Sequence, residues 1–190
     1  MRKNLITAFL MTIVTTVLLG VIYPLLVTGL ARVIFREKAD GQLLQANHQI
    51  VGSRIIGQPF VGPGYFHSRP SAAGNGYEAA NSGGLNLGPT NKKLIDRVAA
   101  DVATDQADNP NELVPVDLVT TSASGLDPHI SPAAADFQVK RIGRVRGVGE
   151  EQLRTLIERH TEARQWGFLG EPRVNVLELN LDLDKKSSGK

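Results

Sequence analysis

The most pronounced hydrophobic pattern in the chain lies near its N-terminus, where the run Leu5 to Ala31 carries no charged side chain. These 27 residues would form a helix about 40 Å long, at about 1.5 Å per residue. The hydrocarbon core of a bilayer is about 30 Å thick, so the run can span it with some tilt. We predict a membrane-spanning helix that is bent at Pro24 or has Pro24 in its outer third.

A cleaved signal peptide is the alternative to a retained anchor. It would share the basic start at Arg2 and Lys3, but its apolar core is typically only about 7–15 residues long. The length of the run therefore favours an anchor. Because short cytoplasmic tails are enriched in Lys and Arg, we expect a single-pass protein of the cell (inner) membrane with a cytoplasmic N-terminus and an extracytoplasmic main domain.

Small side chains recur at every fourth residue within the predicted span. Residues at this spacing share one face of a helix, and small side chains allow a neighbouring membrane helix to approach closely. The same residue types are common in membrane helices generally, so both interpretations stay open. The candidate helix–helix contacts are Ala8, Thr12, Thr16 and Gly20.

Beyond the anchor, the pattern predicts a mixture of helices and strands. We expect strands at Ile50–Val51, Ile55–Ile56, Val114–Thr121 and Val174–Leu183. We expect helices that start at Asn91 and at Ser131–Pro132, the second continuing to Arg146, and a third over Glu150–Arg164.

The segment from Gly62 to Asn91 has little periodicity and is rich in Gly and Pro, which predicts a long functional loop. The fold class is therefore α/β, with one N-terminal transmembrane helix followed by a single mixed α/β extracytoplasmic domain. The expected division is a tail and transmembrane helix at 1–36, the domain at 37–183 and a flexible tail at 184–190.

Composition excludes several classes of function. The chain has no cysteine, so a disulfide framework, a zinc–thiolate site and a cysteine nucleophile are absent. Its four histidines include no pair at i, i+4 spacing, and we predict no metal site. From residue 36 onward there are 18 Lys and Arg against 19 Asp and Glu, so the domain lacks the basic surface that binds nucleic acid.

The stretch GGLNLGPT at 83–90 resembles a phosphate-binding loop. The spacing of its glycines and the final Thr90 fit, but Pro89 occupies the place of the lysine that reaches the phosphates. We interpret it as the lead into the helix at Asn91 and expect Gly83 and Gly88 to be needed where φ is positive. No cofactor is firmly predicted; the remaining candidates for nucleotide contact are Ser82, Gly83 and Gly84.

A second candidate site is the turn GLDPHIS, which contains Asp127, His129 and Ser131. Members of a catalytic triad normally come from separate segments, so this close spacing argues against a triad. We expect Asp127 to accept turn N–H groups and His129 to be structural or to lie at an interface. Arg69, in the long loop, is expected to pair with a carboxylate on this chain or on a partner.

Five motifs give the chain a family resemblance. They are IIGQPF (55–60), YFHSRPSA (65–72), NLGPTN (86–91), SGLDPHISPAAA (124–135) and PRVNVLELNL (172–181). They follow one another in order between residues 55 and 181, a stretch that makes up most of the chain, and with them the chain resembles the C subunit of the Kdp potassium-transporting ATPase.

The resemblance implies an accessory, non-catalytic subunit of an ATP-driven potassium uptake pump. It implies as partners a potassium-binding channel-like subunit, a P-type catalytic subunit and a small single-span subunit. The implied role is to stabilise the assembly and to raise the ATP affinity of the catalytic subunit, so that ATP would act through the complex. On the domain, the candidate interface residues are Arg69, Asn86, Asp127 and His129. The alternatives are a membrane-anchored extracytoplasmic hydrolase that uses His67 or His129 with a serine, and a nucleotide-binding regulatory module.

Overall fold

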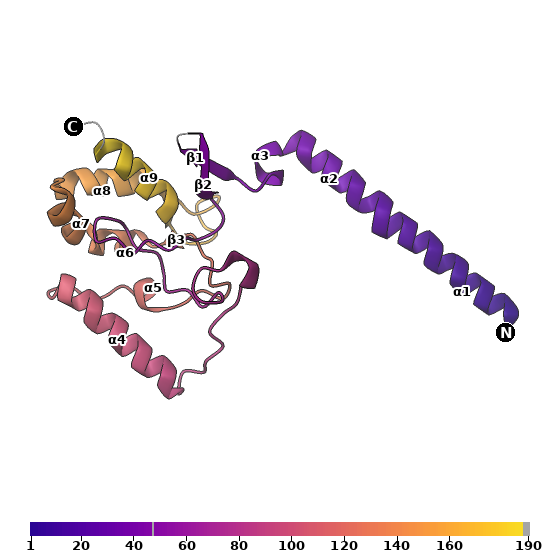
Figure 1. Cartoon of the computed structure of the whole chain (residues 1–190), viewed down its shortest axis with the longest axis horizontal. Coiled ribbons are helices and arrows are strands. Elements are labelled where there is room, and N and C mark those ends of the chain that lie inside the picture. Colours follow the sequence, from indigo (N-terminus) through magenta and orange to yellow (C-terminus); the bar gives the residue numbers. More distant parts are fainter. Residues whose placement is uncertain (47, 188–190) are drawn as a thin grey trace. The chain divides into compact units, whose positions relative to one another are not determined.

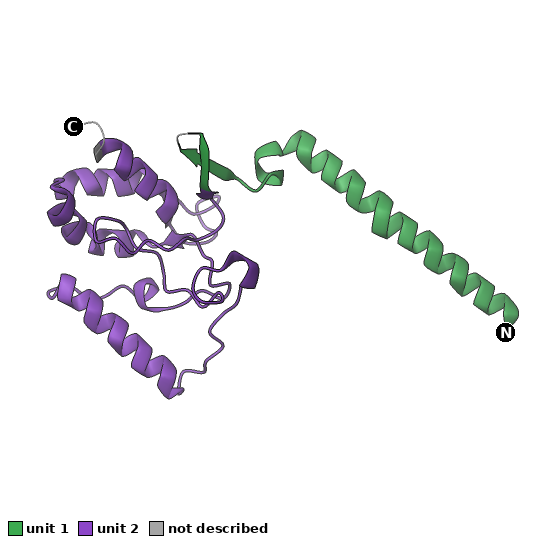
Figure 2. Ribbon diagram, viewed as in Figure 1, with its two compact units in different colours: residues 1–51 green, residues 52–190 purple. Residues whose placement is uncertain are grey.

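The computed structural model describes residues 1–46 and 48–187 (Figure 1). The chain divides into two compact units, Met1–Val51 and Gly52–Lys190 (Figure 2). The division therefore falls after residue 51, whereas the sequence placed the start of the domain at residue 37.

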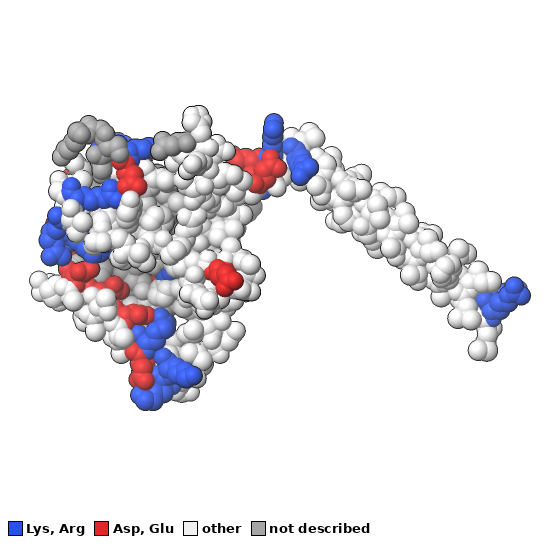
Figure 3. Space-filling model, in the orientation of Figure 1, with Lys and Arg blue, Asp and Glu red and all other residues white. Residues whose placement is uncertain are grey.

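Unit 1 begins with a continuous helix over Arg2–Ile34, long and apolar enough to cross a membrane. On the face shown in Figure 3, its surface is uncharged between the basic groups near its two ends. It consists of α1 (Arg2–Thr15), a π-helical segment (Thr16–Ile22) and α2 (Tyr23–Ile34).

The π-helical segment lies immediately before Pro24. The Tyr23 N–H donates to the Leu18 carbonyl, five residues back, as in a π-helix. Proline has no N–H to donate, and its ring crowds the preceding turn of an α-helix. The wider turn accommodates the ring, so Pro24 changes the helical register without ending the helix.

The connection after the anchor contains α3 (Arg36–Ala39), β1 (Leu43–Ala46) and β2 (Gln49–Ser53). The two strands form a two-stranded sheet, which confirms the strand predicted at Ile50–Val51. The strand predicted at Ile55–Ile56 is wrong. The Ile56 N–H donates to the Ser53 carbonyl at 3.2 Å, so the chain turns directly after β2.

Unit 2 is a mixed unit of helices and one small sheet. Its helices are α4 (Lys92–Asp108), α5 (Val116–Val119), α6 (Pro132–Phe137), α7 (Val139–Arg146), α8 (Glu150–Arg159) and α9 (Val176–Ser187), with a 3₁₀ turn at Ala79–Asn81. The antiparallel sheet has the order β3 (His129–Ile130), β5 (Arg173–Asn175), β4 (Thr161–Glu162).

The main core lies among α6, α7, α8, α9 and β5. Buried apolar side chains fill it, among them Phe66, Ile142, Leu153, Leu156, Val174 and Leu179. Phe66 comes from the long loop, so this loop contributes to the core and is not only a surface connection.

Two predicted helix starts are confirmed by their caps. The Asn91 side chain accepts from the Lys93 N–H at 2.9 Å at the start of α4. The Ser131 hydroxyl accepts from the Ala134 N–H at 3.1 Å at the start of α6. The helix predicted to continue to Arg146 is divided at Gln138 into α6 and α7.

Two other elements differ from the prediction, one in its type and one in its end. The segment predicted as a strand at Val114–Thr121 instead contains the single-turn helix α5, whose end is closed by a bond from the Thr120 hydroxyl to the Val116 carbonyl at 2.7 Å. The helix predicted over Glu150–Arg164 ends at Arg159, because the chain then enters β4.

The predicted strand Val174–Leu183 is confirmed only at its first two residues, because β5 ends at Asn175 and α9 begins. The Asn175 side chain accepts from the Glu178 N–H at 3.1 Å, which caps the new helix. The fully buried positions in α9 include Val176, Leu179 and Leu183, which have helical spacing. Because α9 continues to Ser187, the tail predicted from Asp184 overlaps its last turn.

Candidate functional site

Three of the predicted interface residues meet in one cluster. The Arg69 guanidinium lies 3.2 Å from the Asp127 carboxylate, and it also donates to Thr120. Asp127 also accepts the His129 backbone N–H at 3.0 Å, and the His129 ring nitrogen Nδ1 lies 3.4 Å from the same carboxylate. The long loop and the turn at 125–131 are thereby joined through Asp127.

The Asp127 carboxyl is held in its ionised form. Its half-buried position opposes ionisation, but the hydrogen bonds from His129 and the charge of Arg69 outweigh this cost. The pKa of Asp127 therefore lies below its ordinary value. Such a carboxylate is suited to hold neighbouring groups in place and poorly suited to accept a proton near neutral pH.

A cleft of about 640 Å³ opens beside this cluster. Its volume falls in the range of small-molecule sites, about 300–1,000 Å³. The charged groups that line it are paired within the chain, as shown by the Arg173–Glu162 ion pair at 2.9 Å. Asp117, also in the lining, accepts from the Ser131 N–H at 2.6 Å. The cleft is therefore bordered by side chains that hold the fold together.

The Asp127–His129–Ser131 combination does not have the geometry of a triad. The Ser131 hydroxyl donates to Asp117 at 3.1 Å and accepts from the Ala134 N–H, so it serves as a helix cap. The other histidine considered, His67, has its Nε2 3.0 Å from the Gly62 carbonyl. Burial lowers the pKa of the His67 imidazole and nearby Arg141 lowers it further, so this ring is neutral near pH 7.

The long loop is held by side chains that the sequence analysis did not single out. Buried Asn180 of α9 accepts from the Phe66 N–H and donates to the Phe66 carbonyl, both at 2.9 Å. Gln138 does the same for the next residue, accepting from the His67 N–H at 2.7 Å and donating to its carbonyl at 3.2 Å. We call Asn180 and Gln138 the amide clamps.

Two arginines of α7 continue this pattern. Arg141 donates to the carbonyls of Pro63 and Tyr65, and Arg146 donates to the carbonyl of Gly64. The Arg146 guanidinium also lies over the Tyr65 ring, 4.5 Å from its centre. The carbonyls at 63–67 and the N–H groups of Phe66 and His67 are thus paired with side chains in place of a neighbouring strand. The available sequence signal was an amide or an arginine placed among the apolar positions of amphipathic helices, or at the junction of two helices.

The nucleotide candidates Ser82, Gly83 and Gly84 also make contacts within the fold. The Ser82 hydroxyl and the Gly83 N–H both donate to the Ser124 carbonyl, at 3.0 and 2.9 Å. A Cβ at Gly84 would lie 2.9 Å from the Ala123 carbonyl oxygen. These three residues support the 123–124 segment.

The expectation that Gly83 and Gly88 adopt positive φ is wrong. The residues with positive φ in this region include Asn86, at 51°, and Gly125, at 66°. Asn86 lies in a separate hollow of about 340 Å³ beside α4, with Arg97 and Thr120 in its lining, and is not part of the Asp127 cluster.

The small-residue positions of the anchor retain their shared face through the π-helical segment. The Thr12 hydroxyl donates to the Ala8 carbonyl at 2.9 Å. A Cβ added to Gly20 would lie 3.8 Å from the Thr16 methyl group. Within residues 1–46 and 48–187, no group of three or more His, Asp or Glu side chains is arranged to hold a metal ion.

These features define a class of protein: a single apolar helix joined to a mixed helix–sheet unit whose charged residues form internal pairs. Comparison with known proteins identifies the family. The family model of the K+-transporting ATPase c chain matches residues 5–185. The chain belongs to this family of subunits of the potassium-transporting ATPase.

Named relatives agree over almost the full length. The KdpC subunit of the potassium-transporting ATPase of Koribacter versatilis is 69% identical over 97% of this chain and 95% of its own. The KdpC subunits of Acidobacterium capsulatum, 56% identical, and Rhodopseudomonas palustris, 54% identical, each match at least 96% of this chain and 98% of their own. The resemblance seen in the five motifs is therefore confirmed.

Proposed function

We propose that this chain is an accessory subunit without an active site of its own, whose unit 2 lies outside the cytoplasm and stabilises the assembled pump. The observation that carries the proposal is the internal pairing of the residues that could have supplied chemistry. Asp127 is engaged by Arg69 and His129, and the Ser131 hydroxyl caps α6. A hydrolase would need a serine aligned with a histidine.

The proposed partners are the channel-like, the P-type catalytic and the small single-span subunits. The loop at 62–91 and the turn at 125–131, with Arg69, Asn86, Asp127 and His129, are the proposed contact surface on unit 2. Ser82 and Gly83 bond the Ser124 carbonyl and therefore serve the fold in place of a nucleotide. We therefore propose that any effect on the ATP affinity of the catalytic subunit is a coupling between two separate sites. Any subunit that binds two pump conformations unequally must shift the affinity of their ligands.

The orientation across the membrane can be tested with single cysteines, since the natural chain has none. We expect Ala123→Cys, on the exposed surface of unit 2, to react with an impermeant thiol reagent added outside intact cells. Asn4→Cys, at the opposite end of the anchor, is expected to react only after lysis. The reverse labelling pattern would place unit 2 in the cytoplasm.

The role of the anchor in assembly can be tested on its small-residue face. Replacing Thr16 and Gly20 together with Leu should separate the packed helices and weaken copurification with the other subunits about tenfold, while insertion survives because hydrophobicity rises. The control is Thr7→Leu, on the opposite side of the helix from that face. Equal copurification of both variants and the natural chain would mean that unit 2 alone holds the complex.

A further inference from the structure

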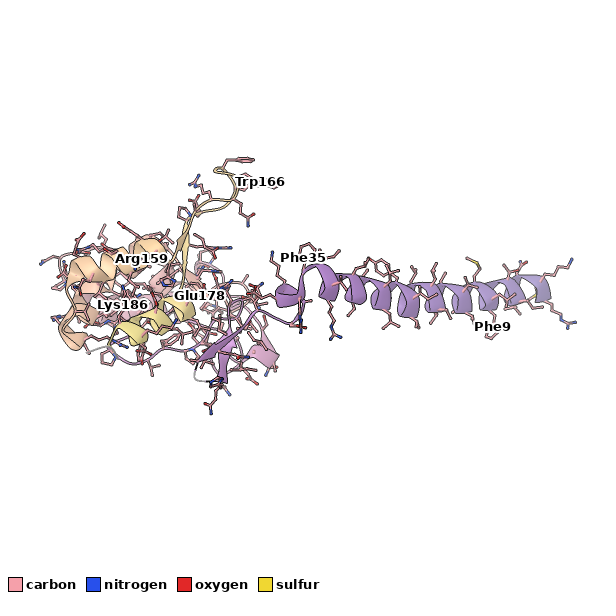
Figure 4. All side chains as sticks on the ribbon, turned by 90° about the horizontal axis from the view of Figure 1, so that it is seen from above. Phe9, Phe35, Arg159, Trp166, Glu178 and Lys186 are labelled. Carbon is pink, nitrogen blue, oxygen red and sulfur yellow. The ribbon has the colours of Figure 1, made fainter. Side chains whose placement is uncertain are left out.

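The segment between β4 and β5 projects from unit 2 and ends in large apolar side chains. Figure 4 shows Trp166 at the outer end of this projection, away from the body of unit 2 that contains Glu178 and Lys186. Trp166 is 85% exposed, Phe168 is 68% exposed and Leu169 is 43% exposed. Among the described residues of unit 2, no other four-residue stretch exposes three large apolar side chains. We call residues 163–172 the finger.

The finger has a defined turn. Gln165 and Leu169 exchange two backbone hydrogen bonds, both 2.9 Å long. Trp166 has a φ of 52°, in the left-handed backbone region that residues other than glycine rarely adopt. Gly167 and Gly170 also have positive φ. The Trp166 and Phe168 rings lie 6.5 Å apart between centres. The apolar tip is therefore presented to solvent by an ordered turn, at a conformational cost.

Charge is confined to the base of the finger. The six residues 165–170 carry no charged side chain. Below them, Arg164 pairs with Glu171 at 2.5 Å and Arg173 pairs with Glu162 at 2.9 Å. An apolar, aromatic end followed by charged pairs is the distribution of a segment that crosses from the acyl region of a bilayer to its headgroups, where Trp is enriched.

We propose that the finger inserts its tip into the interface of a phospholipid bilayer. The bilayer is chosen because this chain carries a helix able to span one, joined to unit 2 through residues 35–51. Such a tether keeps unit 2 near the lipid surface, so even a weak affinity of three apolar side chains for lipid gives high occupancy. The pairing of the charges at the base leaves the finger neutral, and insertion then depends on apolar burial. The inference does not depend on which side of the membrane unit 2 occupies or on the proposed role in the pump.

The test uses the fact that Trp166 is the only tryptophan in the chain. The full chain is reconstituted into phosphatidylcholine vesicles with and without brominated acyl chains, which quench tryptophan by contact. The matched control moves the tryptophan to another highly exposed position, through Trp166→Phe combined with Leu113→Trp, where Leu113 is 89% exposed. We expect brominated lipid to reduce the emission of Trp166 strongly and to leave that of the control unchanged.

The remaining outcomes are also decisive. Acrylamide, a quencher dissolved in the water, reports whether Trp166 is exposed to solvent. Equal emission of Trp166 in both kinds of vesicle, together with strong quenching by acrylamide, would overturn the inference. Protection of Trp166 that appears only when the other subunits are added would overturn it too, and would identify the finger as a protein contact.

A second set of vesicles also contains the anionic lipid phosphatidylglycerol. For a neutral finger, we expect the same quenching with and without this lipid and at high salt. Quenching that appears only with phosphatidylglycerol would contradict insertion by apolar burial.

Discussion

Replacing Asn180 with Leu is expected to lower the free energy of unfolding by about 4 kcal/mol, because one leucine would leave two buried backbone groups unpaired. Both groups belong to Phe66, whose N–H and carbonyl are each bonded to the Asn180 amide at 2.9 Å. Leucine has the same branched arrangement of side-chain heavy atoms and is not smaller than asparagine, so the effect would come from the lost hydrogen bonds and not from a cavity. A loss of this size is a large part of the total stability of a small domain, about 5–15 kcal/mol.

The measurement is urea denaturation of the full chain in detergent, followed by far-ultraviolet circular dichroism. The matched control is Asn111→Leu at an exposed position, where a change within about 0.5 kcal/mol is expected. If the two variants unfold at the same urea concentration, the loop at 62–69 does not depend on the amide clamps.

The second large effect is expected for Gly125→Ala, which should destabilise unit 2 by about 3 kcal/mol or more. Gly125 has a φ of 66°, which strains any residue with a Cβ. The added carbon would also lie 2.6 Å from the Ala73 nitrogen and 2.7 Å from the Gly83 carbonyl oxygen. Both neighbours are backbone atoms, so relief would require the two loops to separate.

Gly83→Ala is the control for this experiment, since an added Cβ there would meet no atom within 4 Å. Its stability should stay within about 0.5 kcal/mol of the natural chain. The same urea titration compares the two variants. If Gly83→Ala destabilises as much as Gly125→Ala, the close approach of Gly125 to Ala73 and Gly83 is not the cause of the loss.

Predictions that rested on local chemistry are those the structure confirms. The helix over Arg2–Ile34 follows from an uninterrupted apolar run, which needs no information from the rest of the chain. The starts of α4 and α6 follow from Asn91 and Ser131, because a capping side chain bonds an N–H only two or three residues away. The ion pair of Arg69 was predicted, although its partner Asp127 was not.

The largest error, at Val174–Leu183, shows how a local pattern can mislead. Leucines at every second residue favour a strand, but Asn175 followed by Glu178 is also the beginning of a capped helix. The pattern is compatible with both, and the packing of Val176, Leu179 and Leu183 in the core decides for the helix.

By itself, the sequence therefore determined the long apolar helix, the helix caps and the family, because each depends on residues close together or on motifs that can be read in order. The tertiary structure alone decided the conformation of the long loop and which partners the candidate site residues bond. Phe66 is held by Asn180, and Arg69 is turned toward Asp127, from positions far away in the chain. A loop without a backbone partner takes its shape from whichever side chains the fold brings to it, and no local pattern records those contacts.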